Sequence, residues 1–140
     1  MTLVSDGLRQ AVIERARGMC EYCRLAQETQ VATFPVDHIQ PISAGGATHL
    51  DNLALACPRC NAVKWIYTAV ADPISGELTQ LFDPRRDNWA DHFRWSTEDS
   101  SMLEMHSAVG RATAELLELN SQHRRQVRYW LTALGLHPPQ

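Results

Sequence analysis

Residues 36–64 read VDHIQPISAGGATHLDNLALACPRCNAVK, and this stretch decides the expected fold. The segment 30–42, which overlaps its start, carries the valine, phenylalanine and isoleucine residues that favour a β-strand, and Pro41 marks the end of that strand. Two glycines then indicate a loop before apolar residues resume. The pattern predicts a strand, a loop, a second strand and a helix, at residues 30–42, 43–48, 50–56 and 61 to about 67.

The four cysteines of the chain form two Cys-x-x-Cys turns, which are Cys20–Cys23 and Cys57–Cys60. This spacing lets both sulfurs of one turn reach a single ion. Four thiolates with no vacant coordination position describe a structural zinc site, and we interpret the cysteines in this way. Two alternatives stay open at this point: separate redox or unpaired cysteine pairs, and the iron–tetrathiolate site of an electron carrier.

The composition is that of a globular protein. The chain has 140 residues, of which 44% are hydrophobic and 21% charged, enough to bury a core in one domain. The N-terminal sequence MTLVSDGLRQ resembles no secretory signal, and no stretch is long and apolar enough for a membrane span, so we expect a cytoplasmic protein. The net charge of −3 is unusual for a non-specific nucleic-acid binder. Any DNA binding would therefore need a local basic patch and a metal ion.

Further elements are expected on both sides of the central stretch. Ser5 or Asp6 can cap a first helix that ends at Gly18. Turn residues and helical periodicity then predict a hairpin, a short helix and two longer helices, at residues 70–82, 87–92, 107–119 and 121–134.

The last of these helices has an apolar stripe with arginines to one side of it. The stripe predicts a packed face, and the tryptophans are expected to pack in the core or the helical tail rather than stack on bases. The arginines could contact phosphates, and solvated helix faces explain them equally well. The stripe is Val127, Trp130, Leu131 and Leu134; the tryptophans are Trp65, Trp89, Trp95 and Trp130; the arginines are Arg124, Arg125 and Arg128.

A set of polar residues in the central stretch suits phosphodiester hydrolysis. That reaction needs a water, a base and positive charge on the phosphate. His38 is a candidate base, because histidine as a class titrates near neutrality. Asp37 and Asn61 offer hard oxygen ligands to one divalent cation, for which magnesium or manganese is favoured. Lys64 lies one helical turn beyond Asn61 and could contact a phosphate.

Together these motifs resemble the HNH endonuclease family, in its four-cysteine zinc, stand-alone bacterial form. The resembling residues are CEYC at 20–23, VDHIQPISAGG at 36–46 and LDNLALACPRCNAVK at 50–64, with Asn in the third motif position where the family name has His. The resemblance implies a ββα-metal fold and single-metal hydrolysis that leaves 5′-phosphate and 3′-hydroxyl ends. It implies that His38 is the base, that Asp37 and Asn61 hold the metal, and that Asn52 orders a loop whose backbone carbonyl orients His38.

The sequence thus predicts an α+β protein with a ββα-metal core, a structural zinc site and a mostly helical C-terminal extension. The expected domains are a nuclease core at residues 1–67 and a hairpin plus helical extension at residues 68–140, packed as a single domain. The expected function is DNA nicking or cleavage with His38, Asn52 and Lys64 in the active site. The alternative is a zinc-stabilised nucleic-acid-binding module without catalysis. A homodimer through the C-terminal helices is compatible with either function.

Overall fold

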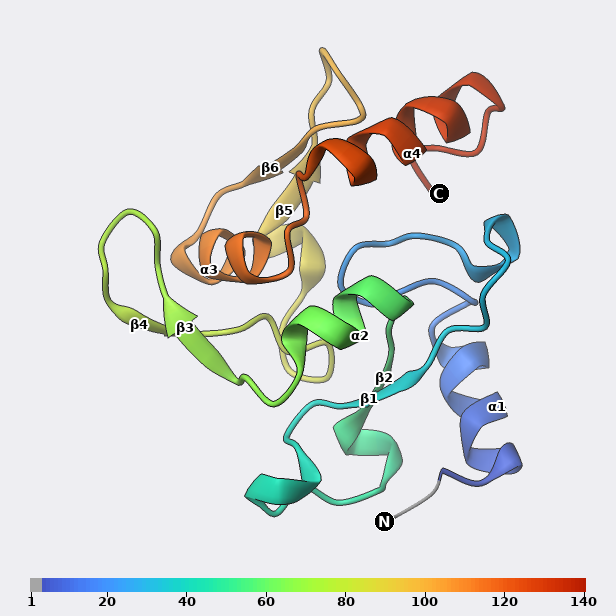
Figure 1. Ribbon diagram of the computed structural model, residues 1–140, viewed down its shortest axis with the longest axis vertical. Helices are drawn as coiled ribbons and strands as arrows, with labels where there is room; N and C mark the ends of the chain where they lie inside the picture. Colours follow the sequence, from blue (N-terminus) through green and yellow to red (C-terminus); the bar gives the residue numbers. More distant parts are fainter. Residues whose placement is uncertain (1–3) are drawn as a thin grey trace. The chain divides into compact units, whose positions relative to one another are not determined.

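A computed structural model describes residues 4–140, and its elements are shown in Figure 1. Residues 1–3 lie outside the described residues. They belong to the predicted nuclease core and to the N-terminal sequence that is expected to carry no secretory signal. The chain divides into two compact units. The described part of the first unit comprises residues 4–68 and 83–86, and the second unit comprises residues 69–82 and 87–140.

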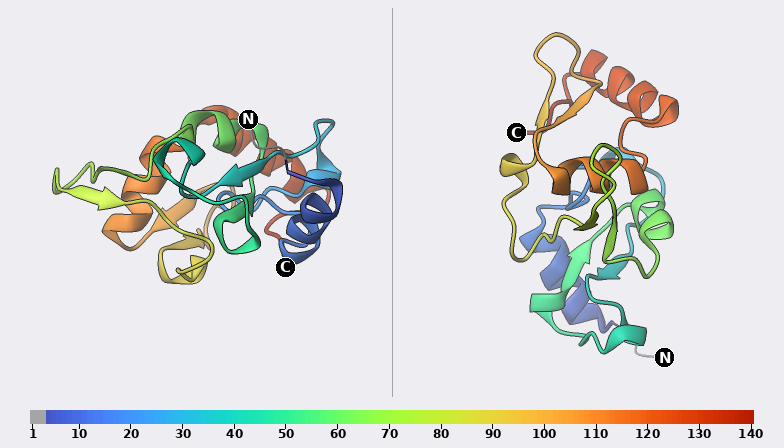
Figure 2. Two further views of the ribbon diagram at one scale, coloured as in Figure 1. Left: turned by 90° about the horizontal axis from the view of Figure 1, so that it is seen from below. Right: turned by 90° about the vertical axis from the view of Figure 1, so that its left-hand side faces the viewer.

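The first unit contains a two-stranded antiparallel ribbon, with one helix before it and one helix after it in the sequence. Strand β1 (Val36–His38) pairs with β2 (Leu53–Leu55), with Asp37 opposite Ala54. Helix α1 (Asp6–Arg15) packs on β2 and lies beside the ribbon in both Figure 1 and Figure 2. Helix α2 (Pro58–Lys64) follows β2 directly. The order β1, β2, α2 is the one predicted from the sequence, although the strands are three residues each.

Helix α2 begins earlier than predicted because its first turn contains the second cysteine pair. Pro58 occupies the first helical position, where its missing N–H costs no hydrogen bond. The Cys57 sulfur caps the helix by accepting a hydrogen bond from the Cys60 N–H. The sequence pattern predicts a helix start at Asn61, because it indicates a separate turn at Cys-Pro-Arg-Cys. The two features overlap, so the helix is anchored directly by the cysteines.

Hydrogen bonds from arginines fasten α1 to the rest of the first unit. Arg15 donates to the carbonyl oxygens of Leu50 and Leu53 at 2.7 and 2.6 Å, and Arg9 donates to that of Phe34 at 2.9 Å. The core beneath α1 is apolar and excludes solvent. Its fully buried side chains include Val12, Phe34, Leu53 and Leu55. Short 3-10 turns at Gln27–Thr29, Ile42–Ala44 and Leu50–Asn52 connect the longer elements.

The second unit combines two hairpins with two helices. Strand β3 (Ala69–Ala71) pairs with β4 (Leu78–Gln80), as the sequence predicts, and helix α3 (Ala108–Leu116) packs against this hairpin. Asp72, at the hairpin turn, is buried and accepts two hydrogen bonds from Arg111 at 2.9 and 2.8 Å. These bonds hold the pKa of the Asp72 carboxyl well below its usual range. The ion pair thus joins the hairpin to α3.

The second hairpin was not predicted. Strand β5 (Phe93–Trp95) pairs with β6 (Leu103–Met105), following a 3-10 turn at Trp89–Asp91 where a short helix was expected. Three-residue strands are too short for a clear alternation of polar and apolar residues. The residues of β6 are leucine, glutamate and methionine, which favour helices when considered alone. Their strand conformation is therefore decided by the pairing with β5.

Helix α4 (Gln122–Ala133) buries a different face from the predicted one. Trp130 and Leu134 are exposed, and the buried residue of the helix is Arg128. The Arg128 guanidinium donates to the carbonyl oxygens of Ser101 and Leu119 at 3.0 and 2.6 Å, and lies 5.0 Å from the ring centre of Trp95. Carbonyl acceptors and an aromatic face therefore replace water around this charge. The predicted homodimer through these helices stays a prediction.

Within residues 4–140, none of the helices combines the length and the apolar character that crossing a membrane would require.

Candidate functional site

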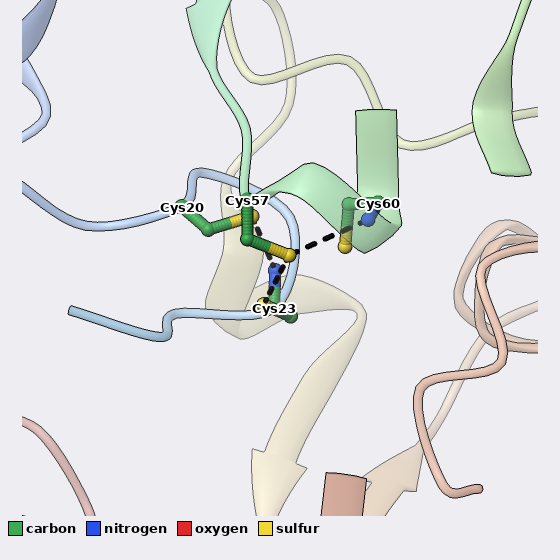
Figure 3. Close-up of side chains that lie close together, drawn as sticks. All are labelled: Cys20, Cys23, Cys57 and Cys60. Carbon is green, nitrogen blue, oxygen red and sulfur yellow. Dashed lines mark hydrogen bonds between the residues drawn. The ribbon is translucent and has the colours of Figure 1, made fainter. Parts of the chain in front are cut away.

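The four cysteine side chains meet in one buried cluster. Figure 3 shows them pointing toward one another from the two Cys-x-x-Cys turns, and all four sulfurs lie within 4.8 Å of each other. Cys23 Sγ and Cys57 Sγ are 3.7 Å apart. That separation is far longer than the roughly 2.05 Å of a disulfide. It agrees with the edge of a tetrahedron of sulfurs about 2.3 Å from a central zinc ion, which is about 3.8 Å.

The electrostatics of the cluster also fit a bound cation. The Cys23 N–H donates to Cys20 Sγ and the Cys60 N–H to Cys57 Sγ, both at 3.4 Å, as expected where sulfur carries negative charge. Burial raises the pKa of the Cys20 thiol, whereas hydrogen bonds from the other thiols lower the pKa of Cys57. Four thiols in one buried cluster cannot all ionise without a counter-charge. A divalent ion that prefers sulfur would supply this counter-charge, and the geometry of the four sulfurs fits a structural zinc site.

The cluster joins segments that are far apart in the sequence. Glu21, inside the first cysteine turn, forms two hydrogen bonds with the backbone of Leu55: its N–H donates to the Leu55 carbonyl at 2.8 Å, and its side-chain carboxylate accepts from the Leu55 N–H at 2.9 Å. Arg85 forms an ion pair with the same carboxylate. The first cysteine turn is thereby fixed to the end of β2, two residues before Cys57.

Asp37 lies in β1 with its carboxylate turned into the protein. Its Oδ2 accepts a hydrogen bond from the Tyr22 hydroxyl at 2.7 Å and lies 3.0 Å from Lys64 Nζ. Burial raises the pKa of the Asp37 carboxyl, and the charge of Lys64 and the Tyr22 hydrogen bond oppose that rise. The other carboxylate oxygen of Asp37, Oδ1, forms no hydrogen bond with any of the described residues.

Lys64 therefore occupies a position that the sequence analysis did not foresee. We expected an ammonium free to contact a phosphate, but the side chain is only 2% exposed. Besides the carboxylate, Nζ lies 3.2 Å from the Ile39 carbonyl oxygen and 3.5 Å from that of His38. Lys64 is thus bound to the end of β1, and a helical spacing pattern cannot distinguish such a lysine from an exposed one.

His38 has different neighbours from Asp37, as expected for adjacent residues in a strand. Its Nε2 lies 2.9 Å from the Thr48 hydroxyl oxygen, and no partner is recorded for Nδ1 within residues 4–140. The sequence analysis did not single out Thr48, and its ten-residue separation from His38 follows no helical or strand period. The contact forms because the loop after β1 folds back toward the strand.

Asn52 closes this loop with three side-chain hydrogen bonds. Its Oδ1 accepts from the Gln40 N–H at 2.9 Å, and its Nδ2 donates to the carbonyls of Gln40 and Ala47 at 3.0 and 2.8 Å. Gly46 lies inside the closed loop, where a Cβ atom would collide with the Gln40 carbonyl and lie 2.9 Å from Asn52 Nδ2. The loop that carries Thr48 is therefore built around a residue without a side chain.

Asn61 lies on α2 one turn before Lys64, so both residues are on the helix face that meets β1. Its side chain is partly exposed, and no side-chain hydrogen bond is recorded for it within the described residues. Asp37 and Asn61 thus both offer oxygen atoms without protein partners. Such a donor set fits a hard cation that completes its coordination with water or phosphate.

Several arginines that could supply positive charge to a phosphate have structural partners instead. Arg85, Arg111 and Arg125 form ion pairs with Glu21, Asp72 and Asp99, and Arg128 is buried. Arg86 keeps a highly exposed side chain, 3.9 Å from Asp83. The sequence pattern places Arg124, Arg125 and Arg128 to one side of the apolar stripe, but Arg125 binds Asp99 and Arg128 donates to backbone carbonyls.

Removing the metal from the cysteine cluster is expected to unfold the first unit. A Cys60→Ser variant should lose zinc and melt at a lower temperature, because the start of α2 loses its anchor. The purified protein should contain one zinc ion per chain, measured by atomic emission, and strong chelators should lower its melting temperature. Ala62→Ser, on the exposed side of the same helix, is the matched control and should keep both properties. Equal zinc content in the two variants would contradict the assignment.

The substitution Gly46→Ala is expected to destabilise the loop that carries Thr48. We expect a loss of roughly 2 kcal/mol in the free energy of unfolding, since backbone must move to admit the methyl group. Gly7→Ala is the control: its Cβ meets no atom within 4 Å and it lies in α1, so a gain of about 0.5–1 kcal/mol is expected. Urea unfolding in zinc-containing buffer measures both changes, and equal stabilities would argue against the closed loop.

Comparison with protein families identifies the segment that contains this site. The model described as HNH endonuclease matches residues 20–64, from the first cysteine of the cluster to the lysine bound to Asp37. A search of curated proteins finds no match for the chain. The family indicates a nuclease or another nucleic-acid-related function. Residues 20–64 of this chain, with the four-cysteine cluster and the β1–β2–α2 unit, are therefore a domain of the HNH endonuclease family.

Proposed function

We propose that this protein is a metal-dependent DNA endonuclease in which His38 is the general base. The observation that carries the proposal is the environment of His38. Its imidazole lies at the end of β1, inside the matched segment, with Nε2 on Thr48 and no partner recorded for Nδ1 among the described residues. A base needs one ring nitrogen oriented by the protein and the other accessible to water.

The proposal assigns a separate role to each ring nitrogen of His38. In the tautomer that this mechanism requires, the Nε2–H donates a hydrogen bond to the Thr48 hydroxyl oxygen, and Nδ1 keeps its lone pair. Nδ1 takes a proton from water as the water oxygen attacks phosphorus. The bond from phosphorus to the 3′ oxygen breaks, and the departing 3′ oxygen takes a proton from solvent water, which leaves a 5′-phosphate and a 3′-hydroxyl. Asn52 and Gly46 act indirectly, because they close the loop that presents Thr48.

Asp37 and Asn61 are the residues that would hold the catalytic cation. Asp37 Oδ1 and the Asn61 side-chain oxygen are the candidate donors. An all-oxygen set favours magnesium or manganese over metals that prefer nitrogen or sulfur. When bound, such an ion polarises the phosphate and stabilises the negative charge on the leaving oxygen. The cysteine cluster has the opposite donor chemistry, so the two sites select different metals.

A nucleic-acid-binding module without catalysis is the second candidate. One observation favours it: Asp37 Oδ2 is already held by Tyr22 and Lys64, which leaves one carboxylate oxygen for a metal. The net charge of −3 and the paired arginines offer little free positive charge to either function. A DNA-bound but inert protein would support this candidate.

Nicking of supercoiled plasmid tests the proposal directly. The zinc-loaded protein should nick DNA with added magnesium or manganese and not with EDTA, and His38→Ala should reduce the rate by about 10²- to 10⁴-fold. His49→Ala is the matched control, because His49 is a solvent-exposed histidine in the segment between β1 and β2 and pairs with Asp51. Equal cleavage by wild type and His38→Ala would rule out His38 as the base.

The Thr48 hydroxyl should affect the rate by orienting His38. Thr48→Val replaces the hydroxyl with a methyl group of similar size and is expected to lower kcat by about tenfold to a hundredfold. Thr48→Ser keeps the hydroxyl and should retain most of the activity. Single-turnover nicking separates this effect from substrate binding. If Thr48→Val and Thr48→Ser cleave equally well, the hydroxyl does not orient the base.

A further inference from the structure

Tyr22 links the cysteine cluster to the carboxylate of Asp37. It lies between Cys20 and Cys23 in the first cysteine turn, and its side chain is 1% exposed. Its hydroxyl donates to Asp37 Oδ2 at 2.7 Å across fifteen residues of sequence. A short hydrogen bond to a buried carboxylate restricts the rotation of that carboxylate more than apolar packing does.

Lys64, the last residue of α2, contacts the same Asp37 oxygen, Oδ2. Its Nζ lies 3.0 Å from Asp37 Oδ2 and also contacts the carbonyl oxygens of Ile39 and His38. Three acceptors match the three N–H donors of an ammonium group. With the side chain 2% exposed, neither solvent nor another residue competes for these donors.

We propose that Tyr22 and Lys64 are positioning residues that hold Asp37 Oδ2 and so reserve Oδ1 for the catalytic cation. This inference rests on the proposed function and deepens it. Two donors on one oxygen fix the plane of the carboxylate and prevent both oxygens from binding the cation together. Groups that orient a metal ligand in this way commonly change metal affinity by about 10- to 100-fold.

The arrangement also couples the two metal sites. Cys20 and Cys23, the two ends of the first cysteine turn, both belong to the cluster. Tyr22 lies between them in the sequence. Lys64 ends the helix that begins at Cys57. The cysteine cluster therefore positions both Tyr22 and Lys64. The Asp37 carboxylate should be correctly oriented only when the cluster is intact.

A different role for Lys64 predicts the opposite effect on metal binding. If its ammonium merely occupied the place of the cation, removing it would strengthen metal binding. Its burial and its two carbonyl acceptors favour a fixed position instead. The sign of the change in affinity therefore separates a positioning lysine from a competing one.

Manganese binding to the zinc-loaded protein, measured by electron paramagnetic resonance without DNA, tests the inference. Tyr22→Phe removes only the hydroxyl and should raise the Kd for Mn²⁺ by about tenfold or more, with zinc content unchanged. Tyr67→Phe, at a tyrosine that is 45% exposed, is the control and should not change the Kd. Lys64→Met should also weaken Mn²⁺ binding, and tighter binding would overturn its positioning role. Should Lys64→Met fail to fold, Tyr22→Phe decides alone.

An Asp37→Asn variant distinguishes failure of this inference from failure of the proposed function. If wild type binds Mn²⁺, Asp37→Asn weakens that binding and Tyr22→Phe does not, the positioning inference is wrong while the catalytic site stands. If Asp37→Asn binds Mn²⁺ as well as wild type, or wild type binds none, the proposed cation site is itself wrong. Weakened binding in both Asp37→Asn and Tyr22→Phe, with Tyr67→Phe unchanged, is the expected result.

Discussion

Four sulfur atoms within 4.8 Å of one another are the constraint on which the HNH domain depends. They bring together two turns separated by 34 residues, and the segment between the turns contains β1, the loop after it and β2. That segment is too short to bury a large core, and its paired strands have three residues each. A metal ion bound by the four thiolates would compensate for the small core, since the free energy of metal binding is available only to the folded chain.

The candidate active site uses this frame through polar contacts rather than apolar packing. Asp37 receives two donors, one from the first cysteine turn and one from the helix that starts at the second. His38 receives one contact, from a loop that Asn52 closes. The carboxylate is therefore held inside the protein, whereas the imidazole lies in a partly exposed loop environment. A buried ligand and a more accessible base suit a site that holds a cation and activates water.

Sequence reasoning succeeded where a signal is local. The two Cys-x-x-Cys spacings, the order of β1, β2 and α2, the β3–β4 hairpin and the capped helices α1, α3 and α4 each depend on residues within a few positions of one another. It failed for β5 and β6, whose three residues carry no clear period. It also failed for α4, where the apolar stripe suggested the buried face, but Arg128 finds carbonyl acceptors and the face of Trp95.

The sequence by itself determined the family, the cysteine cluster and the identities of Asp37, His38, Asn52 and Asn61 as candidates, because motif spacing encodes them. Only the tertiary structure decided that Lys64 is buried against Asp37, that Tyr22 donates to the same oxygen and that Thr48 contacts His38. These contacts join residues 10 to 27 positions apart and follow no local period. Their formation depends on how the loop after β1 closes and how α2 packs on β1. The spacing of residues in the sequence does not give the energy of such packing.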